Sequence, residues 1–265
     1  MAFNKPDRVS EIAIEAGVDK ARSPVLSLLL LGFLGGAFIA LGFLLDIRVS
    51  GNLPKDWGSF GSFLGAAVFP VGLVLVVLAG SELITGNMMS VPMALYAKRI
   101  TWKGLLKNWV FVTFANLIGA LFVAYFFGHV VGLTESGPFL AKTLAIAQGK
   151  LEESFFQTFI SGIGCNWLVC LAIWLAYGAD DVVGKILGIW FPIMAFVAIG
   201  FQHVVANMFL IPAAIFAGYY TWMDFIANVI PAFIGNVIGG AVFVGFVYFF
   251  TYQKSIKDKA KRKVS

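Results

Sequence analysis

Two apolar stretches of this chain are each interrupted near the middle by polar and glycine residues, and the two interruptions resemble each other. The first stretch begins at Phe69-Pro70 and is interrupted at 82–86; the second begins at Phe191-Pro192 and is interrupted at 201–203. After both interruptions the chain continues with Asn-Met and places a proline five residues beyond the asparagine. Non-helical backbone persists within a bilayer only where it lines a cavity or packs against protein. The paired breaks therefore predict a substrate path at mid-membrane.

The rest of the chain is similarly apolar, with 60% hydrophobic residues and a mean hydropathy of +0.89 over 265 residues. These values exceed those of ordinary soluble domains. A helix needs about 20 apolar residues to cross a bilayer. Stretches of sufficient length lie at about 24–46, 59–97, 104–128, 155–177, 186–217 and 228–251. The sequence therefore predicts an all-α membrane protein with six transmembrane helices, of which the second and fifth are broken.

The chain also contains an internal duplication. Asn87 and Asn207 are 120 residues apart, and so are Asn116 and Asn236, each pair in similar local sequence. Two halves of three spans each follow from this agreement. Because a three-span unit ends on the opposite side of the membrane, its copy has to sit inverted, with the site at the interface between the halves. The first and fourth spans match only weakly, so their equivalence is assumed.

The duplication divides the chain into four expected segments. They are an N-terminal cytoplasmic amphipathic segment at 1–23, three-span repeats at 24–130 and 131–251, and a basic cytoplasmic tail at 252–265. Residues 6–20 have the pattern of a short amphipathic helix on the membrane surface. A solvated helix that caps the bundle would show the same pattern.

Positive charge is distributed unevenly around the six spans. With the N-terminus in the cytoplasm, 15 Lys and Arg residues lie inside and four lie outside, namely Arg48, Lys55, Lys142 and Lys150. Cytoplasmic loops carry an excess of these residues. We therefore expect a multi-pass protein of the cell membrane with both termini in the cytoplasm. The basic tail is then a flank that is solvated or faces lipid headgroups, and no nucleic-acid partner is expected.

Signatures of enzymes and cofactors are missing from the sequence. Cys165 and Cys170 lie five residues apart in one span, where they cannot form a disulfide with each other. No Walker loop is present, and no Ser/His/Asp or Cys/His arrangement can be read. We expect a transport protein rather than an enzyme, without a metal or another cofactor.

His203 and Thr85 lie within the two breaks and are the main candidates for contact with a substrate. An ionisable side chain at this depth is costly and usually functional, and histidine changes charge near physiological pH. We expect His203 to meet an anion and to exchange a proton with it; the alternative is a neutral imidazole bonded to freed backbone. Thr85 either donates to the substrate or to His203, or only caps a broken helix.

A carboxylate and three amides lie close to the breaks or within the spans. Glu82 stands beside the first break with no cationic partner in its own span, and we expect it to bind backbone amides of the loop rather than substrate. Asn116, Asn166 and Asn236 either line a pore or form hydrogen bonds between helices.

Apolar side chains near the breaks are candidates for constrictions that exclude hydrated ions. They are Phe69, Leu73, Phe196 and Val197. The alternative for each is ordinary helix packing. Lys150, which precedes the fourth span, either attracts anions to the outer mouth of a pore or is a solvated loop lysine beside acidic neighbours.

Four segments in order along the chain resemble the formate/nitrite transporter family. They are 83–87, 165–172, 201–208 and 234–240, and the likeness extends from about residue 10 to residue 251. The resemblance implies a symmetric pentamer of six-span protomers with an aquaporin-like fold. Each protomer would carry its own pore for small monovalent anions such as formate, nitrite or hydrosulfide.

The resemblance also implies roles for single residues. His203 matches the central pore histidine, Thr85 the threonine of a mobile loop, and Asn236 an asparagine near the histidine. Lys150 matches a basic residue of the outer vestibule, and the four apolar candidates fall where the family has its constrictions. Gln202 departs from the family pattern, because an acidic residue is common before the histidine.

A second departure is Ile84, which stands where phenylalanine is usual before the threonine. Segment 80–89 and the N-terminal region look like Gram-positive members associated with formate dehydrogenases, so we expect formate, with nitrite or hydrosulfide as alternatives. A facilitator of neutral solutes is disfavoured because Asn-Pro-Ala boxes and an arginine within a span are missing. An assembly subunit for a dehydrogenase is disfavoured because the inner loops are short.

Overall fold

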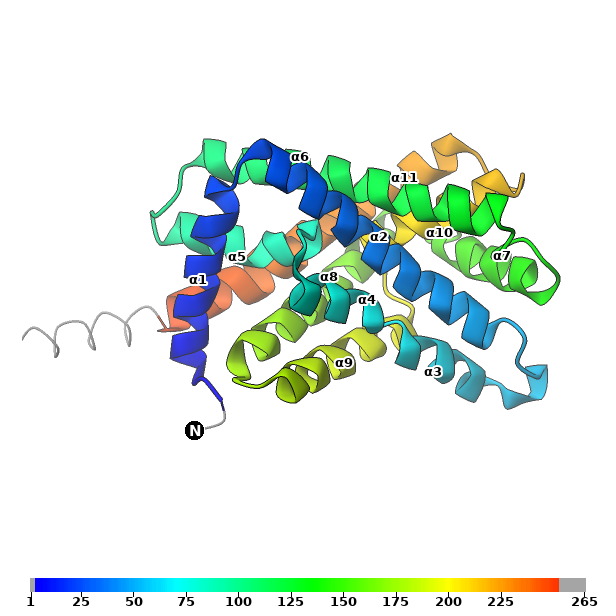
Figure 1. The fold of residues 1–265 in the computed structure, drawn as a ribbon, viewed down its shortest axis with the longest axis horizontal. Coiled ribbons are helices and arrows are strands. Elements are labelled where there is room, and N and C mark those ends of the chain that lie inside the picture. The colour runs from blue at the N-terminus through cyan, green and yellow to red at the C-terminus, as the bar shows by residue number, and fades with distance from the viewer. Residues whose placement is uncertain (1–2, 253–265) are drawn as a thin grey trace, which may run out of the picture.

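The computed structural model describes residues 3–252, and these residues form a bundle of helices (Figure 1). The α-helices are α1 (Pro6–Arg22), α2 (Val25–Ser50), α3 (Ser59–Val68), α4 (Val71–Val74), α5 (Ile84–Tyr96), α6 (Trp102–Phe122), α7 (Pro138–Leu151), α8 (Phe155–Gly178), α9 (Val182–Ile199), α10 (Val204–Phe216) and α11 (Trp222–Val237). Tighter or wider helical turns form η1 (Lys55–Trp57), η2 (Leu75–Gly80), η3 (Val123–Val130) and η4 (Ile238–Phe246). Most of the tail predicted at 252–265 lies outside the described residues.

Within residues 3–252, six helical stretches are long and apolar enough to cross a membrane. They are Val25–Ser50, Ser59–Gly80, Trp102–Val130, Phe155–Gly178, Val182–Ile199 and Trp222–Tyr252. This number confirms the prediction of an all-α protein with six spans. The apolar helix α10 has only 13 residues and is too short to cross alone.

The second and fifth spans each end at a glycine in the left-handed backbone region. Gly80 has a φ of +84° and Gly200 a φ of +91°, and a Cβ on either would meet no atom within 4 Å. Glycine is therefore required for the backbone angle and not for lack of space. Three non-helical residues follow Gly80 before α5 begins, and three follow Gly200 before α10 begins.

Equivalent glycines bring equivalent helices into close contact in the two halves. A Cβ added to Gly119 would overlap the carbonyl oxygen of Phe33, and one added to Gly239 would overlap that of Ile163. Small residues allow such approach where lipid provides no hydrophobic drive between helices. These equivalent contacts show that α2 corresponds to α8. The sequences of these two helices, the first and fourth spans, are too weakly similar to establish this.

Helices α1 and α7 lie at opposite ends of the molecule (Figure 1). Neither is a candidate span. Helix α1 packs against α5, the helix after the first break, and α7 packs against α10, the helix after the second. The buried face of α1 includes Val9, Ala13 and Gly17. Of the two interpretations of the N-terminal segment, this packing agrees with a helix that caps the bundle.

The glycine contacts predict a specific loss of stability. Gly119→Val would separate α2 from α6, and overpacking of this kind costs about 1–3 kcal/mol. The thermal midpoint of the purified protein in detergent should fall by several degrees. Gly149→Ala is the matched control, because a Cβ at Gly149 meets nothing within 4 Å. Equal midpoints for the two variants would contradict this account of the packing.

Candidate functional site

The two breaks meet at the centre of the bundle through one pair of side chains. The hydroxyl oxygen of Thr85 lies 3.1 Å from Nε2 of His203, and both residues are buried. Thr85 belongs to the first turn of α5, and His203 is the residue that caps the N-terminus of α10. Because each residue comes from a different half, the pair joins the two breaks.

The cap determines which nitrogen of His203 carries the proton. Nδ1 accepts a hydrogen bond from the backbone N–H of Ala206 at 3.1 Å, so it cannot carry a hydrogen itself. The neutral ring is then protonated at Nε2, which donates to the hydroxyl oxygen of Thr85. The hydroxyl hydrogen of Thr85 is used by no hydrogen bond within residues 3–252. The Nε2–H of His203 and the hydroxyl of Thr85 are therefore both hydrogen-bond donors at the contact between the two breaks.

Asn236 uses its whole amide to hold the second break in place. Its Oδ1 accepts from the backbone N–H of Val204 at 2.9 Å, and its Nδ2 donates to the carbonyls of Gly162 at 2.8 Å and Gln202 at 3.0 Å. The side chain is fully buried. It satisfies two backbone groups that the break leaves free, those of Val204 and Gln202, and ties them to the carbonyl of Gly162 within α8.

Asn116 does the same for the first break. Its Oδ1 accepts from Ile84 N at 2.9 Å, and its Nδ2 donates to the carbonyls of Gly32 at 2.7 Å and Glu82 at 2.8 Å. Asn166 lies between the halves, where its Nδ2 donates to the carbonyls of Thr85 and Asn236. All three amides thus bond to backbone.

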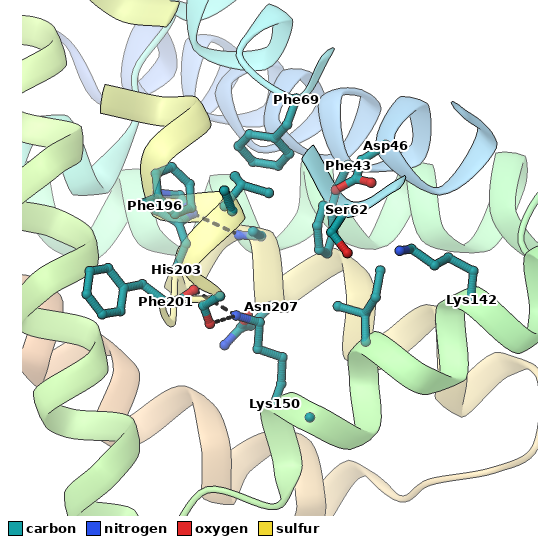
Figure 2. Close-up of a pocket in the computed structure, with 16 residues that line it drawn as sticks. Phe43, Asp46, Ser62, Phe69, Lys142, Lys150, Phe196, Phe201, His203 and Asn207 are labelled. Carbon is teal, nitrogen blue, oxygen red and sulfur yellow. Dashed lines mark hydrogen bonds between the residues drawn. The ribbon is translucent and has the colours of Figure 1, made fainter. Parts of the chain in front are cut away.

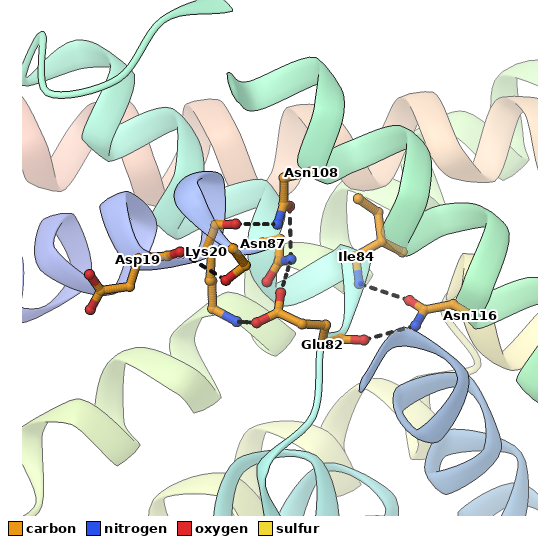
Figure 3. A network of polar contacts seen from close by, with 8 residues as sticks. Asp19, Lys20, Glu82, Ile84, Asn87, Asn108 and Asn116 are labelled. Carbon is orange, nitrogen blue, oxygen red and sulfur yellow. Dashed lines mark hydrogen bonds and ion pairs between the residues drawn. The ribbon is translucent and has the colours of Figure 1, made fainter. Parts of the chain in front are cut away.

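A second layer of polar contacts connects the first break to α1 (Figure 3). Asn87 Nδ2 donates to Glu82 Oε2 at 2.6 Å and to Asn108 Oδ1 at 2.9 Å. Asn108 in turn donates to the carbonyl of Lys20. The Lys20 ammonium lies 2.8 Å from Glu82 Oε1. The Glu82 carboxylate therefore binds a side-chain amide and a lysine of another helix, and not the backbone amides of the loop that were predicted from the sequence.

The second break repeats this layer with one chemical difference. Gln202 Oε1 accepts from Asn207 and Asn228, and Asn228 donates to the carbonyl of Lys150, as Asn108 does to that of Lys20. Since Gln202 has no charge, the Lys150 ammonium donates to two carbonyls instead, those of Gly200 at 2.6 Å and Phe201 at 2.7 Å. Burial lowers the pKa of Lys150 to about 8.

A cavity of about 350 Å³ leads to His203 from the end of the molecule where α7 lies (Figure 2). Its lining includes Phe43, Asp46, Ser62, Phe69, Lys142, Lys150, Phe196, Val197, His203 and Asn207. The Phe196 ring stacks on the imidazole of His203 with centroids 5.5 Å apart, and Phe69 meets Phe196 edge-on at 5.6 Å. Aromatic rings therefore cover the approach to the histidine.

The predicted site residues fall into two groups. His203, Lys150, Phe69, Phe196 and Val197 line the cavity. Thr85, Leu73, Asn166 and Asn236 are buried and do not line it, although Thr85 contacts His203 directly.

Other lining residues were not predicted as site residues from the sequence, among them Phe43, Asp46 and Lys142. For Asp46 a signal existed, because it is an ionisable residue within an apolar span.

Comparison with known proteins gives consistent matches along the chain. The family model described as formate/nitrite transporter matches residues 7–250. The formate channel BtFdhC of Bacillus thuringiensis is 68% identical over 254 residues, which cover 96% of this chain and 98% of that protein.

Two solved structures resemble the fold. One is described as an FNT family ion channel, with a TM-score of 0.85 and 28% identity, covering 92% of this chain and 98% of the other. The second is described as a pentameric formate channel with formate bound, with a TM-score of 0.74 and 31% identity, covering 86% and 98%.

The three hydrogen bonds of Asn236, which tether the second break, predict that Asn236→Leu severely impairs folding. This change removes the Asn236 partner of the buried Val204 N–H and of the buried Gln202 carbonyl, and each unmet group costs about 1–3 kcal/mol. Little folded protein should elute from size exclusion in detergent. Asn52→Leu, the same change in an exposed loop, is the control. Normal folding of Asn236→Leu would show that the tether is dispensable.

Proposed function

Because this chain belongs to the formate/nitrite transporter family, whose members are channels and not enzymes, we propose that it conducts formate across the cell membrane. The contact between Thr85 and His203 at the end of the cavity carries this proposal. The names of the Bacillus thuringiensis relative and of the formate-bound neighbour support formate as the cargo. Nitrite and hydrosulfide are monovalent anions that the same donors would accept.

The charges around the cavity suit the first step of anion transport. Lys150 places a cationic amine at the lining and has no carboxylate hydrogen-bonded to it within the described residues. Its positive potential draws an anion into the cavity. Phe69 and Phe196 then form an apolar passage that a hydrated ion does not enter, so formate sheds water there.

At the end of the passage, formate meets the two donors at the break. The Nε2–H of His203 and the hydroxyl of Thr85 replace part of the lost hydration, because hydrogen bonds to a charged acceptor are stronger than those between neutral groups. Formation of these bonds requires the His203–Thr85 hydrogen bond to open. The anion thus separates the two halves of the site as it passes.

We also consider whether formate crosses together with a proton supplied by His203. A neutral imidazole is too weak an acid to protonate formate, so His203 first has to take a proton from water at Nδ1 before the imidazolium can give its Nε2 proton to the anion. Nδ1 is occupied by the N–H of Ala206. Electroneutral transport of formic acid therefore requires movement at the first turn of α10, whereas conduction of the anion alone does not.

The proposal also assigns the orientation and the assembly. The excess of positive residues near the termini supports a cytoplasmic location for both, so the cavity beside α7 opens to the outside. The pentameric neighbour supports five copies, each with its own pore. The exposed apolar side chains of the six spans are then divided between lipid and neighbouring protomers.

His203→Ala tests the proposed pore. Loss of a hydrogen bond to a charged group, about 1.5–3 kcal/mol, should lower formate flux roughly 10- to 100-fold. Flux and current are measured in liposomes for formate, nitrite and hydrosulfide in parallel. His129→Ala is the matched control, because His129 pairs with Glu135 outside the cavity and is partly exposed. Wild-type protein without flux of any of these anions would refute the channel.

The pKa of Lys150 predicts a fall of formate current between pH 7 and pH 9. Lys150 is charged below a pKa of about 8 and neutral above it, so its attraction for anions declines through this range while formate stays ionised. Lys150→Met should conduct less and lose this alkaline limb, and Lys150→Arg should keep current to higher pH. If the current of Lys150→Met still falls between pH 7 and pH 9, the fall is caused by another group.

A further inference from the structure

Asp46 is a carboxylate at the cavity that transport as described above does not use. It is only 5% exposed and belongs to the last part of α2. Its Oδ1 accepts a hydrogen bond from Ser50 Oγ at 3.0 Å. A Cβ on Gly65 would overlap this oxygen, so the carboxylate is held between α2 and α3. Its Oδ2 receives no hydrogen bond from the described residues, and the side chain lines the cavity.

Lys142 of α7 extends its ammonium into the same space (Figure 2). No ion pair within 4.0 Å joins it to Asp46 among the described residues. The nearby Arg48 is engaged elsewhere, with its guanidinium 3.5 Å from the centre of the Phe139 ring and a hydrogen bond to the carbonyl of Leu133. Asp46 and Lys142 therefore face the cavity as separate charges.

The duplicated framework does not explain this pair. The relation of α2 to α8 places Ala176 where Asp46 would be repeated, and the relation of α1 to α7 places Ile12 where Lys142 would be repeated. Because one half of the bundle folds without charges at these positions, the other half does not need them for folding. An unneeded carboxylate in an apolar span points to function.

The charged side chains that line the cavity are Lys142, Lys150 and Asp46. His203 also lines it and is neutral, because its Nδ1 accepts the hydrogen bond that caps α10. The three charges sum to one positive charge. A monovalent anion neutralises this cavity, whereas a dianion leaves it negative. Without Asp46 the cavity would carry two positive charges, would hold a monovalent anion too tightly and would accept dianions.

We propose that Asp46 determines the valence selectivity of the cavity by offsetting one of its two lysines. The Asp46 carboxylate competes with an entering anion for the Lys142 ammonium. This competition keeps monovalent anions weakly bound and dianions out. This inference rests on the proposed function and adds a specificity-determining pair to it. The pair acts at the outer mouth, before the anion reaches His203 and Thr85.

Asp46→Asn keeps the shape of the side chain and removes its charge. The KM for external formate should fall on the order of threefold to tenfold, as one nearby unit charge contributes at effective dielectric constants between about 20 and 80. Inorganic sulfate, added outside at constant ionic strength and pH 7, should inhibit formate flux in this variant and leave the wild type nearly unaffected.

Lys142→Gln removes one positive charge from a half-exposed position and should raise the KM by a similar factor. The double variant Asp46→Asn/Lys142→Gln restores the net charge and should return both the KM and the sulfate response toward wild type. Ser50→Ala is the control, because it removes the bond to Oδ1 but leaves the charge. If Asp46→Asn does not fold, the KM of Lys142→Gln alone still decides.

The outcomes separate this inference from the proposed function. Absence of formate flux in the wild type would refute the proposed function itself. A wild type that conducts formate, with variants whose KM and sulfate response are unchanged, would overturn the role of Asp46 and leave the channel intact. Equal inhibition of wild type and Asp46→Asn by sulfate would also overturn it. Opposite KM shifts that cancel in the double variant would support it.

Discussion

The structure depends on one requirement, that backbone groups freed in mid-membrane find partners within the protein. Two asparagines meet it, because an amide can accept one N–H and donate to two carbonyls at the same time. Asn116 and Asn236 do this at equivalent breaks. Fixed backbone on both sides then positions Thr85 against His203. A polar meeting point inside an apolar bundle is possible only because this requirement is satisfied first.

The two halves share this framework and differ in charge. Near the termini, Lys20 and Glu82 form an ion pair that leaves no net charge. At the other end, Gln202 stands where Glu82 is repeated, and Lys150 bonds to carbonyls. His203 and Thr85 are likewise unmatched, since their counterparts are Leu83 and Val205. The two ends of the scaffold therefore share a hydrogen-bonding pattern and differ in charge.

Much of this arrangement was predictable from local sequence. The lengths of apolar runs gave the six spans, and the glycine-punctuated breaks indicated the central site, because both signals lie within short segments. Contacts between distant segments were not predictable. The partner of Glu82 comes from α1, and the charges of Asp46 and Lys142 come together only when α2 and α7 are packed. Leu73 and Phe69 look alike in sequence, yet only Phe69 lines the cavity.

The capping role of His203 has a consequence for how the ring behaves. A side chain that closes the start of a helix cannot swing between the two ends of the bundle without losing a cap worth about 1 kcal/mol. The cap therefore favours one position of the imidazole, in which the Nε2 edge is turned to Thr85 and one face of the ring is covered by Phe196. In the proposed transport, an anion that reaches this point would therefore displace the Thr85 side chain rather than the imidazole.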